Sequence, residues 1–273
     1  MITIYFSGTG NSEYLAKQFH EKMKGGTDSK AGVFSIEEDV DFVTLLKEND
    51  TVCFCYPIYG SRVPLIMRKF VRKYLEALKG KKLIIFATQY LFSGDGARVF
   101  VDMLPKGHVQ VIYAEHFFMP NNVCNFIIFP KGNNQKNQRV LEKAEEKLER
   151  VCQDIKQGII RKRGFNIFST CLGGAQGLFW QGKSSSFTVN PNTGEAKMTK
   201  AVYIHKDCTK CNLCVQICPM KNLSIKNERV IHHKNCTGCY RCVNQCPHQA
   251  ISIFFKRKPK WQYNRQKVFP TVR

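Results

Sequence analysis

The chain has 273 residues, 43% of them hydrophobic, which suits one sizeable globular domain together with a smaller one. Its 42 Lys and Arg outnumber its 21 Asp and Glu, and the formal net charge of +21 should attract anionic partners and repel cationic ones. Apolar runs are far too short for a membrane helix, and residues 1–6 contain neither a basic leader nor a small-residue cleavage site. We therefore expect a soluble, cytoplasmic protein without membrane insertion.

The N-terminal stretch predicts a strand, a polar loop and a helix. Residues 1–6 form an apolar strand pattern, and residues 13–23 place their apolar side chains on one side of a helix. Between them lie Ser7, Gly8, Thr9, Gly10, Asn11 and Ser12. Such a loop surrounds an anion with backbone N–H groups and the positive end of a helix. Asn11 stands where a Walker loop needs lysine, and Glu13 where a dinucleotide fingerprint needs a third glycine, so we expect a phosphate site without a cation.

This loop resembles the FMN phosphate loop of flavodoxins, and the resemblance extends over the next hundred residues. Strands are predicted at 31–34, 51–56, 82–87 and 109–114, with helices near 41–46, 64–78 and 96–104. The resemblance implies an α/β fold with a doubly wound, parallel, five-stranded sheet in the order 2-1-3-4-5. The flavin would then lie at the carboxyl ends of strands 1 and 3.

Two further loops complete the flavin site that the resemblance implies, with the isoalloxazine ring between them. The loop after the third strand contains Pro57, Ile58, Tyr59 and Gly60, and the loop after the fourth contains Thr88, Gln89, Tyr90, Phe92, Ser93 and Gly94. We expect Tyr59 and Tyr90 to stack on the ring, and Gly60 to permit a peptide flip that offers a carbonyl to the reduced flavin. The alternative is that both tyrosines only anchor their loops. Residues 119–122, after the fifth strand, indicate no more than a turn.

A long amphipathic helix is predicted over residues 133–158, and it closes a first domain of residues 1–160. Residues 161–200 are harder to assign, because they mix basic residues, glycines and aromatics. We expect their aromatics to pack between the domains: Phe165, Phe168, Phe179 and Trp180. Residues 187–198 should form a hairpin or extended arm that turns at 190–194. The alternative is a mobile tether.

Eight of the thirteen cysteines form two copies of the pattern C-x2-C-x2-C-x3-C-P, 28 residues apart. This is the bacterial ferredoxin pattern for [4Fe–4S] clusters, in which the fourth cysteine binds the other cluster. One cluster is therefore assigned to Cys208, Cys211, Cys214 and Cys246, and the other to Cys236, Cys239, Cys242 and Cys218. The alternative is a pair of zinc sites, but zinc gives no reason for the third cysteine, the exchanged fourth or the proline.

The whole chain resembles the bacterial and archaeal flavodoxin–ferredoxin fusion proteins. The resemblance implies an FMN domain at 1–160, an interdomain segment at 161–200, a small α+β ferredoxin domain with two [4Fe–4S] clusters at 201–255 and a basic tail at 256–273. Short strands are expected at 223–225 and 250–253. The tail interleaves cations with Trp261, Tyr263 and Phe269, which suits nucleic acid or a membrane surface. Docking of these aromatics back onto the fold is favoured.

These cofactors imply an electron-transfer protein, because clusters pass single electrons and a flavin converts between one-electron and two-electron traffic. Flavodoxins and ferredoxins are commonly acidic whereas this chain is basic, so we expect an acidic redox protein as its partner. The alternative is a self-contained reductase in which Arg62 or Tyr90 helps to bind a small oxidised substrate, and enzyme activity stays open. A redox-responsive nucleic-acid binder is disfavoured.

Overall fold

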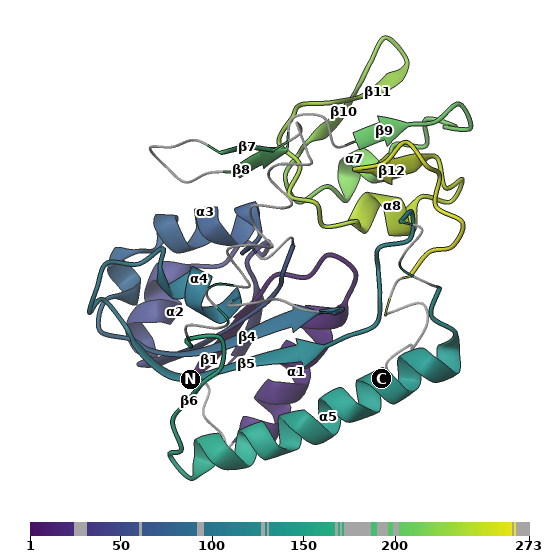
Figure 1. Ribbon diagram of the computed structural model, residues 1–273. Coiled ribbons are helices and arrows are strands. Elements are labelled where there is room, and N and C mark those ends of the chain that lie inside the picture. The colour runs from purple at the N-terminus through teal and green to yellow at the C-terminus, as the bar shows by residue number, and fades with distance from the viewer. Residues whose placement is uncertain are drawn as a thin grey trace. The chain divides into compact units, whose positions relative to one another are not determined.

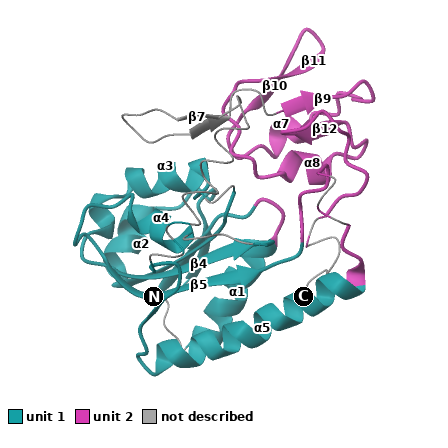
Figure 2. Cartoon of the chain, in the orientation of Figure 1, with its two compact units in different colours: residues 1–7, 11–120, 135–178 teal, residues 8–10, 121–134, 179–273 magenta. Residues whose placement is uncertain are grey.

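The computed structural model is shown in Figure 1. It describes residues 1–24, 32–59, 62–91, 96–126, 129, 131–166, 169, 171, 187–189, 196–198, 202–263 and 265. The chain divides into two compact units, which Figure 2 colours separately. Unit 1 comprises residues 1–7, 11–120 and 135–178, and unit 2 comprises residues 8–10, 121–134 and 179–273.

Unit 1 is built on a parallel sheet in the order β2-β1-β3-β4-β5-β6. Its strands are β1 (Ile2–Tyr5), β2 (Gly32–Ser35), β3 (Thr51–Pro57), β4 (Lys82–Gln89), β5 (Gln110–Phe118) and β6 (Arg161–Lys162). The predicted doubly wound sheet and its order are confirmed. The predicted count of five strands was one short, because the two-residue β6 pairs with Tyr113 and Ala114 of β5.

Helices cover both faces of this sheet (Figure 1). One face carries α1 (Asn11–Met23) and α5 (Asn134–Lys156), and the other carries α2 (Phe42–Glu48), α3 (Leu65–Lys73) and α4 (Gly96–Val101); the short 3-10 turn η1 (Glu76–Leu78) follows α3. The predicted helix at 133–158 is thus confirmed as α5. Among the helices of the described residues, none has the length and apolar character needed to cross a bilayer.

Aromatic rings pack helices against both faces of the sheet. A strand can supply rings to either face, because its alternate residues point to opposite sides. Phe54 and Tyr56 of β3 pack on Phe100 of α4, with ring centroids 4.9 Å and 5.4 Å apart. On the opposite face Phe86 of β4 packs on Phe19 of α1 at 4.8 Å. Strands β1, β3 and β4 pair in parallel, so their carboxyl ends meet at one edge of the sheet.

Unit 2 repeats a short arrangement of loop, one-turn helix and strand. Helix α7 (Leu213–Gln216) and strand β10 (Leu223–Lys226) form the first copy, and α8 (Arg241–Gln245) and β12 (Ile251–Ile253) begin 28 residues later. Strand β10 pairs antiparallel with β11 (Arg229–His232), and β12 pairs antiparallel with β9 (Val202–Ile204). The short strands predicted near residues 223 and 251 are therefore confirmed.

A separate antiparallel pair confirms the hairpin that was predicted over residues 187–198. It consists of β7 (Phe187–Val189) and β8 (Ala196–Met198), with Phe187 opposite Met198. The turn at 190–194 lies outside the described residues, as do Phe168, Phe179 and Trp180. The predicted packing of those three aromatics therefore stays a prediction.

The described part of the C-terminal tail is held by hydrogen bonds within unit 2. The Gln262 side chain donates to the Val243 carbonyl at 2.8 Å, and the Tyr263 N–H donates to Asn244 Oδ1 at 2.7 Å. Tyr263 is only 2% exposed. The Arg265 N–H donates to the carbonyl of Thr9, which also belongs to unit 2, at 3.0 Å. Over these residues the tail docks on the fold, as the sequence favoured.

One buried histidine makes unit 1 sensitive to acid. Burial, together with the nearby Arg163 and Lys147, lowers the pKa of His116 on β5 to about 4, against the opposing charge of Glu115. An unfolded histidine titrates near pH 6.5. Between these two values the unfolded chain therefore binds more protons than the folded chain. The stability associated with neutral His116 is fully present above about pH 6.5 and is lost as the pH falls toward 4.

The substitution His116→Gln should weaken this dependence on pH. Because glutamine does not titrate, the variant should lose about 2 kcal/mol less unfolding free energy than the wild type between pH 7 and pH 5. Urea unfolding of unit 1, followed by flavin release and tyrosine fluorescence at both pH values, measures this difference. Identical losses in the two proteins would show that His116 does not control the acid response.

Candidate functional site

The predicted phosphate loop joins β1 to α1, which begins at Asn11. Four of its polar residues are buried, each at most 9% exposed: Ser7, Thr9, Asn11 and Ser12. Gly10 has a φ of 95°, in the left-handed region that favours glycine. A Cβ added to Gly10 would lie 2.9 Å from the Cβ of Arg265, closer than two such carbons approach. The loop therefore needs glycine here for both its conformation and its packing.

Hydrogen bonds join the predicted flavin loops at the carboxyl edge of the sheet. Ser12 Oγ and Thr88 Oγ1 share a hydrogen bond of 2.7 Å, which ties the start of α1 to the end of β4. The Ile58 N–H donates to the Thr88 carbonyl at 2.9 Å, which ties the end of β3 to β4. Cys55 Sγ also donates to the Ser12 carbonyl at 3.2 Å. The structure thus brings Ser12, Ile58 and Thr88 together, as predicted.

Sequence reasoning missed two partners of the phosphate loop, Pro120 and Asn122. Asn11 Nδ2 donates to the Pro120 carbonyl at 3.0 Å, and within unit 2 the Asn122 side chain donates to Thr9 Oγ1 at 3.0 Å. Both lie in the turn after β5 to which no chemistry was assigned. Their signal was positional, because this turn follows a parallel strand whose carboxyl end shares the edge with β1 and β4.

The aromatic part of the predicted flavin site is only partly described. Tyr59 pairs with Arg62 through N–H to carbonyl bonds in both directions, at 3.1 Å and 3.2 Å, and Tyr90 is half-buried after the end of β4. The remaining members lie outside the described residues: Gly60, Phe92, Ser93 and Gly94. The stacking roles of Tyr59 and Tyr90 stay predictions.

The described residues fit the phosphate end of FMN. Strand β1 has β2 on one side and β3 on the other, so the loop lies at the point where the strand order reverses. Hydroxyl and amide side chains together with the N-terminal end of α1 supply neutral donors and a partial positive charge. These are the groups that a phosphate ester needs.

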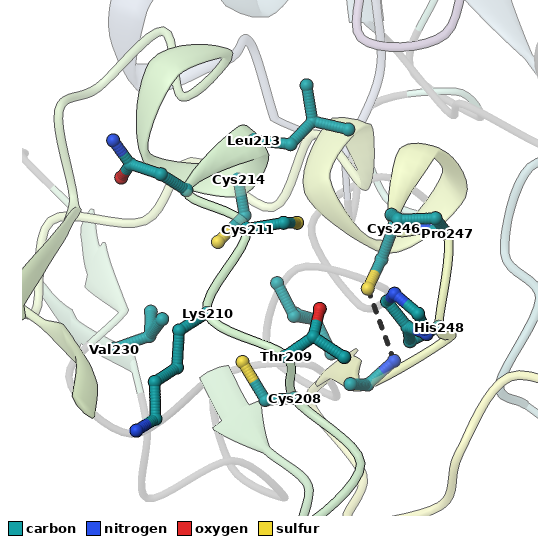
Figure 3. Close-up of a pocket in the computed structure, with 13 residues that line it drawn as sticks. Cys208, Thr209, Lys210, Cys211, Leu213, Cys214, Val230, Cys246, Pro247 and His248 are labelled. Carbon is teal, nitrogen blue, oxygen red and sulfur yellow. Dashed lines mark hydrogen bonds between the residues drawn. The ribbon is translucent and has the colours of Figure 1, made fainter. Parts of the chain in front are cut away.

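The eight predicted ligand cysteines gather in two groups in unit 2. Figure 3 shows the sulfur atoms of the first group around one open space: Cys208, Cys211, Cys214 and Cys246. The second group lines another pocket: Cys218, Cys236, Cys239 and Cys242. In each group three cysteines come from one repeat and the fourth from the other, as the pattern predicts. Their binding of iron stays a prediction.

Left-handed residues shape the loops that carry these cysteines. Lys210 and Asn212 have φ values of 60° and 65°, and the corresponding Gly238 and Tyr240 have 74° and 59°. Left-handed residues that alternate with right-handed ones turn successive N–H groups toward one side, which makes a concavity suited to an anion. A cubane with its four thiolates is such an anion.

Backbone N–H groups also hold the sulfur of each fourth cysteine. The Asn222 N–H donates to Cys218 Sγ at 3.2 Å, and the Ala250 N–H donates to Cys246 Sγ at 3.3 Å, which Figure 3 marks with a dashed line. Both donors lie four residues after their cysteine. The proline that follows each cysteine has no N–H of its own and fixes the local backbone. These bonds orient the thiolates and offset part of their charge.

Burial favours the protonated thiol at Cys214 and Cys236 when no metal is bound. Together with neighbouring cysteines it raises the pKa of Cys214 to about 11 and that of Cys236 to about 12. Iron binds the thiolate, so metal binding must displace these protons. Within the described ranges, no three His, Cys, Asp or Glu side chains converge on a position for one ion. Cubane ligands lie farther apart than that, since each binds a different iron.

Comparison with known proteins assigns two parts of the chain. A family model described as "Flavodoxin domain" matches residues 2–121, and one described as "4Fe-4S dicluster domain" matches residues 207–250. The chain is a flavodoxin–ferredoxin fusion. The two domains of this fusion imply a flavin, FMN, and iron–sulfur clusters, and they make it an electron-transfer protein. No curated protein matches the fusion.

Solved flavodoxins resemble the first part of the fusion. A flavodoxin from the domain Archaea is 18% identical, covers 57% of this chain and 97% of its own, and has a TM-score of 0.36. The two-electron reduced flavodoxin of Megasphaera elsdenii is 25% identical, covers 42% and 85%, and has a TM-score of 0.37. Oxidised flavodoxin 2 from Bacillus cereus is 14% identical, covers 57% and 97%, and has a TM-score of 0.38. The flavodoxin assignment of residues 2–121 rests on the family model.

Exchange of the fourth cysteine gives a test in which distant residues act together. Cys246→Ser and Cys208→Ser should alter the same EPR signal of the reduced fusion and lower its iron content, whereas Cys218→Ser should alter the other signal. Cys171→Ser, at an exposed cysteine outside both groups, is the control and should keep all the iron. If Cys246→Ser altered the same signal as its neighbour Cys242→Ser, the exchange would be wrong.

A methyl group on the phosphate loop should weaken FMN binding. Gly10→Ala adds a Cβ in a left-handed conformation and against Arg265, so we expect at least about tenfold weaker binding of FMN to the apoprotein. Gly107→Ala is a matched control, because Gly107 also has a positive φ of 74° but nothing within 4 Å of the added carbon. Quenching of flavin fluorescence on titration measures both affinities. Equal affinities in the two variants would contradict the assigned role of the loop.

Proposed function

We propose that the fusion relays electrons between one FMN and two [4Fe–4S] clusters, and exchanges them with a separate acidic redox protein. The observation that carries this proposal is the gathering of eight cysteine side chains into two groups of four, each completed by the other repeat. One chain therefore holds a two-electron cofactor site and two one-electron cofactor sites. That combination suits the conversion of paired electrons into single ones.

The polar loop and the strand ends would bind and orient the flavin. Ser7, Thr9, Asn11 and Ser12 supply donors for the phosphate without a lysine or arginine of their own, and the N-terminal end of α1 adds a partial positive charge. The bond between Ser12 and Thr88 fixes this loop against β4, which leads into Tyr90. The other predicted contacts to the ring come from Pro57, Ile58, Tyr59, Gly60, Gln89, Phe92, Ser93 and Gly94.

The cysteine side chains would hold the clusters close to each other. Cys214 and Cys218 lie four residues apart at α7 but belong to different groups, as do Cys242 and Cys246 at α8. One helical turn spans about 5 Å, so each helix would link the two clusters over a short path. Burial of Cys239 and Cys242 would limit the access of water to the thiolates of the second group.

FMN supplies two-electron and one-electron transfer when it is bound, and each cluster supplies one-electron transfer. The polypeptide contributes binding, orientation and exclusion of water. Thiolate ligands and clusters persist best in a reducing compartment, which favours the cytoplasm.

Cofactor counts and a reductive titration test the relay. Anaerobically purified fusion, reconstituted with FMN, should contain about one flavin, about eight irons and about eight sulfides per chain, and should take up about four electrons. Zinc, or fewer than about eight irons, would rule out two clusters, and failure to bind FMN would rule out the flavin half. Saturable reduction of a small acceptor, with turnover at substrate-like rates and no protein partner, would instead make the fusion a reductase.

A further inference from the structure

The two cluster loops have the same cysteine spacing but differ sharply in exposure. Thr209 and Cys211 of the first loop are exposed, whereas Thr237 and Cys239 at the equivalent positions of the second loop are buried. The equivalent positions are 28 residues apart, and both loops belong to unit 2. Of the two groups, the first therefore has a cysteine open to solvent.

The second loop is covered by residues of its own unit. Tyr240 is 3% exposed, and its hydroxyl donates to Asn125 Oδ1 at 3.0 Å. Asn125 in turn donates to the carbonyl of Ile253 on β12 at 2.8 Å, and Cys124 belongs to the same buried cluster as Tyr240. Asn212, the counterpart of Tyr240, is only half-buried. Cys124 and Asn125 therefore pack beside Tyr240 of the second loop, whereas Cys211 of the first loop is exposed.

A lysine stands in the first loop where the second has glycine. Lys210 has a φ of 60° and Gly238 has a φ of 74°, so both adopt a conformation that a side chain makes unfavourable by about 1 kcal/mol. Lys210 nonetheless lines the first pocket and is exposed. It pairs with Glu228 at 3.2 Å, with side chains 50% and 87% exposed, and such a pair contributes little to stability. A role in contacting another molecule, rather than in stabilising the fold, accounts better for Lys210.

The part of unit 2 that carries both cluster loops is strongly basic. Residues 202–263 contain eleven Lys and Arg but only two acids, Asp207 and Glu228. Both acids pair with lysines, Asp207 with Lys258 and Glu228 with Lys210. Glu228 lies between Lys226 and Arg229 in the β10–β11 hairpin, so this ion pair brings two further exposed cations beside the loop. The residues that line the second pocket include no charged side chain.

We propose that the first cluster site is the electron port of the fusion, and that the acidic redox protein docks over Cys211 against the basic rim formed by Lys206, Lys210, Lys226 and Arg229. This inference rests on the proposed function and locates its partner. Electron tunnelling weakens with distance, so the accessible site exchanges electrons faster than the covered one. At this surface one electron leaves the chain as the partner's cofactor gains it, or moves in the opposite direction, and no bond or proton is exchanged.

Repeat symmetry supplies a matched pair of variants. Lys206 and Lys234 each lie two residues before the first cysteine of a repeat, and both are exposed. Lys206→Glu and Lys234→Glu therefore make the same charge change, one at the proposed port and one at the covered loop. Lys210→Gly is a third variant, which removes the cation, gives the first loop the residue of the second and relieves its backbone strain.

The probe is an acidic b-type cytochrome that oxidises the reduced holoprotein in a stopped-flow experiment, with a basic c-type cytochrome for comparison. For the wild type the rate constant with the acidic cytochrome should fall as salt rises from about 0.02 M to about 0.3 M. At the lower salt, Lys206→Glu should slow this reaction about fivefold and Lys210→Gly about threefold, whereas Lys234→Glu should leave it within about twofold.

Equal slowing by Lys206→Glu and Lys234→Glu would show that only overall charge matters. The first cluster site would then not be the electron port. If the wild type reacts faster with the basic cytochrome than with the acidic one at low salt, the proposal of an acidic partner is wrong. A DNA duplex that binds at physiological salt and is released by Lys206→Glu would assign the rim to nucleic acid and overturn docking. Each measurement uses protein with full FMN and iron content, so a fusion that lacks them refutes the proposed function separately.

Discussion

Exchange of the fourth cysteine is the constraint on which unit 2 depends. Cys246 lies with Cys208, Cys211 and Cys214, and Cys218 lies with the three cysteines of the second repeat. Neither repeat therefore completes a site alone. The loops must face each other, and the N–H groups of Asn222 and Ala250 must reach the exchanged sulfurs. The small paired strands add buried hydrophobic residues around this arrangement, among them Leu223, Val230 and Ile251.

The sequence predicted most of the framework because its signals are local. Buried parallel strands are nearly continuous apolar runs, so β1, β3 and β4 were found close to their observed bounds. The phosphate loop and the cysteine repeats have fixed spacings that chemistry dictates. Strand β6 was missed because two basic residues pair with β5 through backbone groups alone, and backbone pairing leaves no side-chain pattern.

Other features depend on contacts between distant parts of the sequence. Asn122 donates a hydrogen bond to Thr9, more than a hundred residues away, and no sequence pattern in the turn after β5 predicts this bond. Thr209 and Thr237 are the same residue in the same pattern, yet one is exposed and the other buried. The second loop also contacts Asn125, which lies 115 residues from Tyr240, and no window around either cysteine run contains such a contact.

The basic character of unit 2 acts mainly beyond the fold. Exposed ion pairs such as that of Lys210 with Glu228 contribute little to stability, and salt screens them. The summed field of many lysines extends over about 10 Å and accelerates the approach of an oppositely charged surface. Clusters and phosphate carry negative charge of their own, so part of the basic excess also offsets the cofactors. On the proposed function, one composition would serve both cofactor retention and partner choice.

The exchanged cysteines also set the order in which the protein can mature on the ribosome. Three ligands of the first site are synthesised early, but its last ligand, Cys246, emerges after every other cysteine of the two groups. The second site gains all its ligands by Cys242 and is complete first, although its own repeat is made later. If iron binds as proposed, the first site can be completed only once Cys246 has been made, and a nascent chain that stalls before Cys246 has three thiols of that site without their fourth.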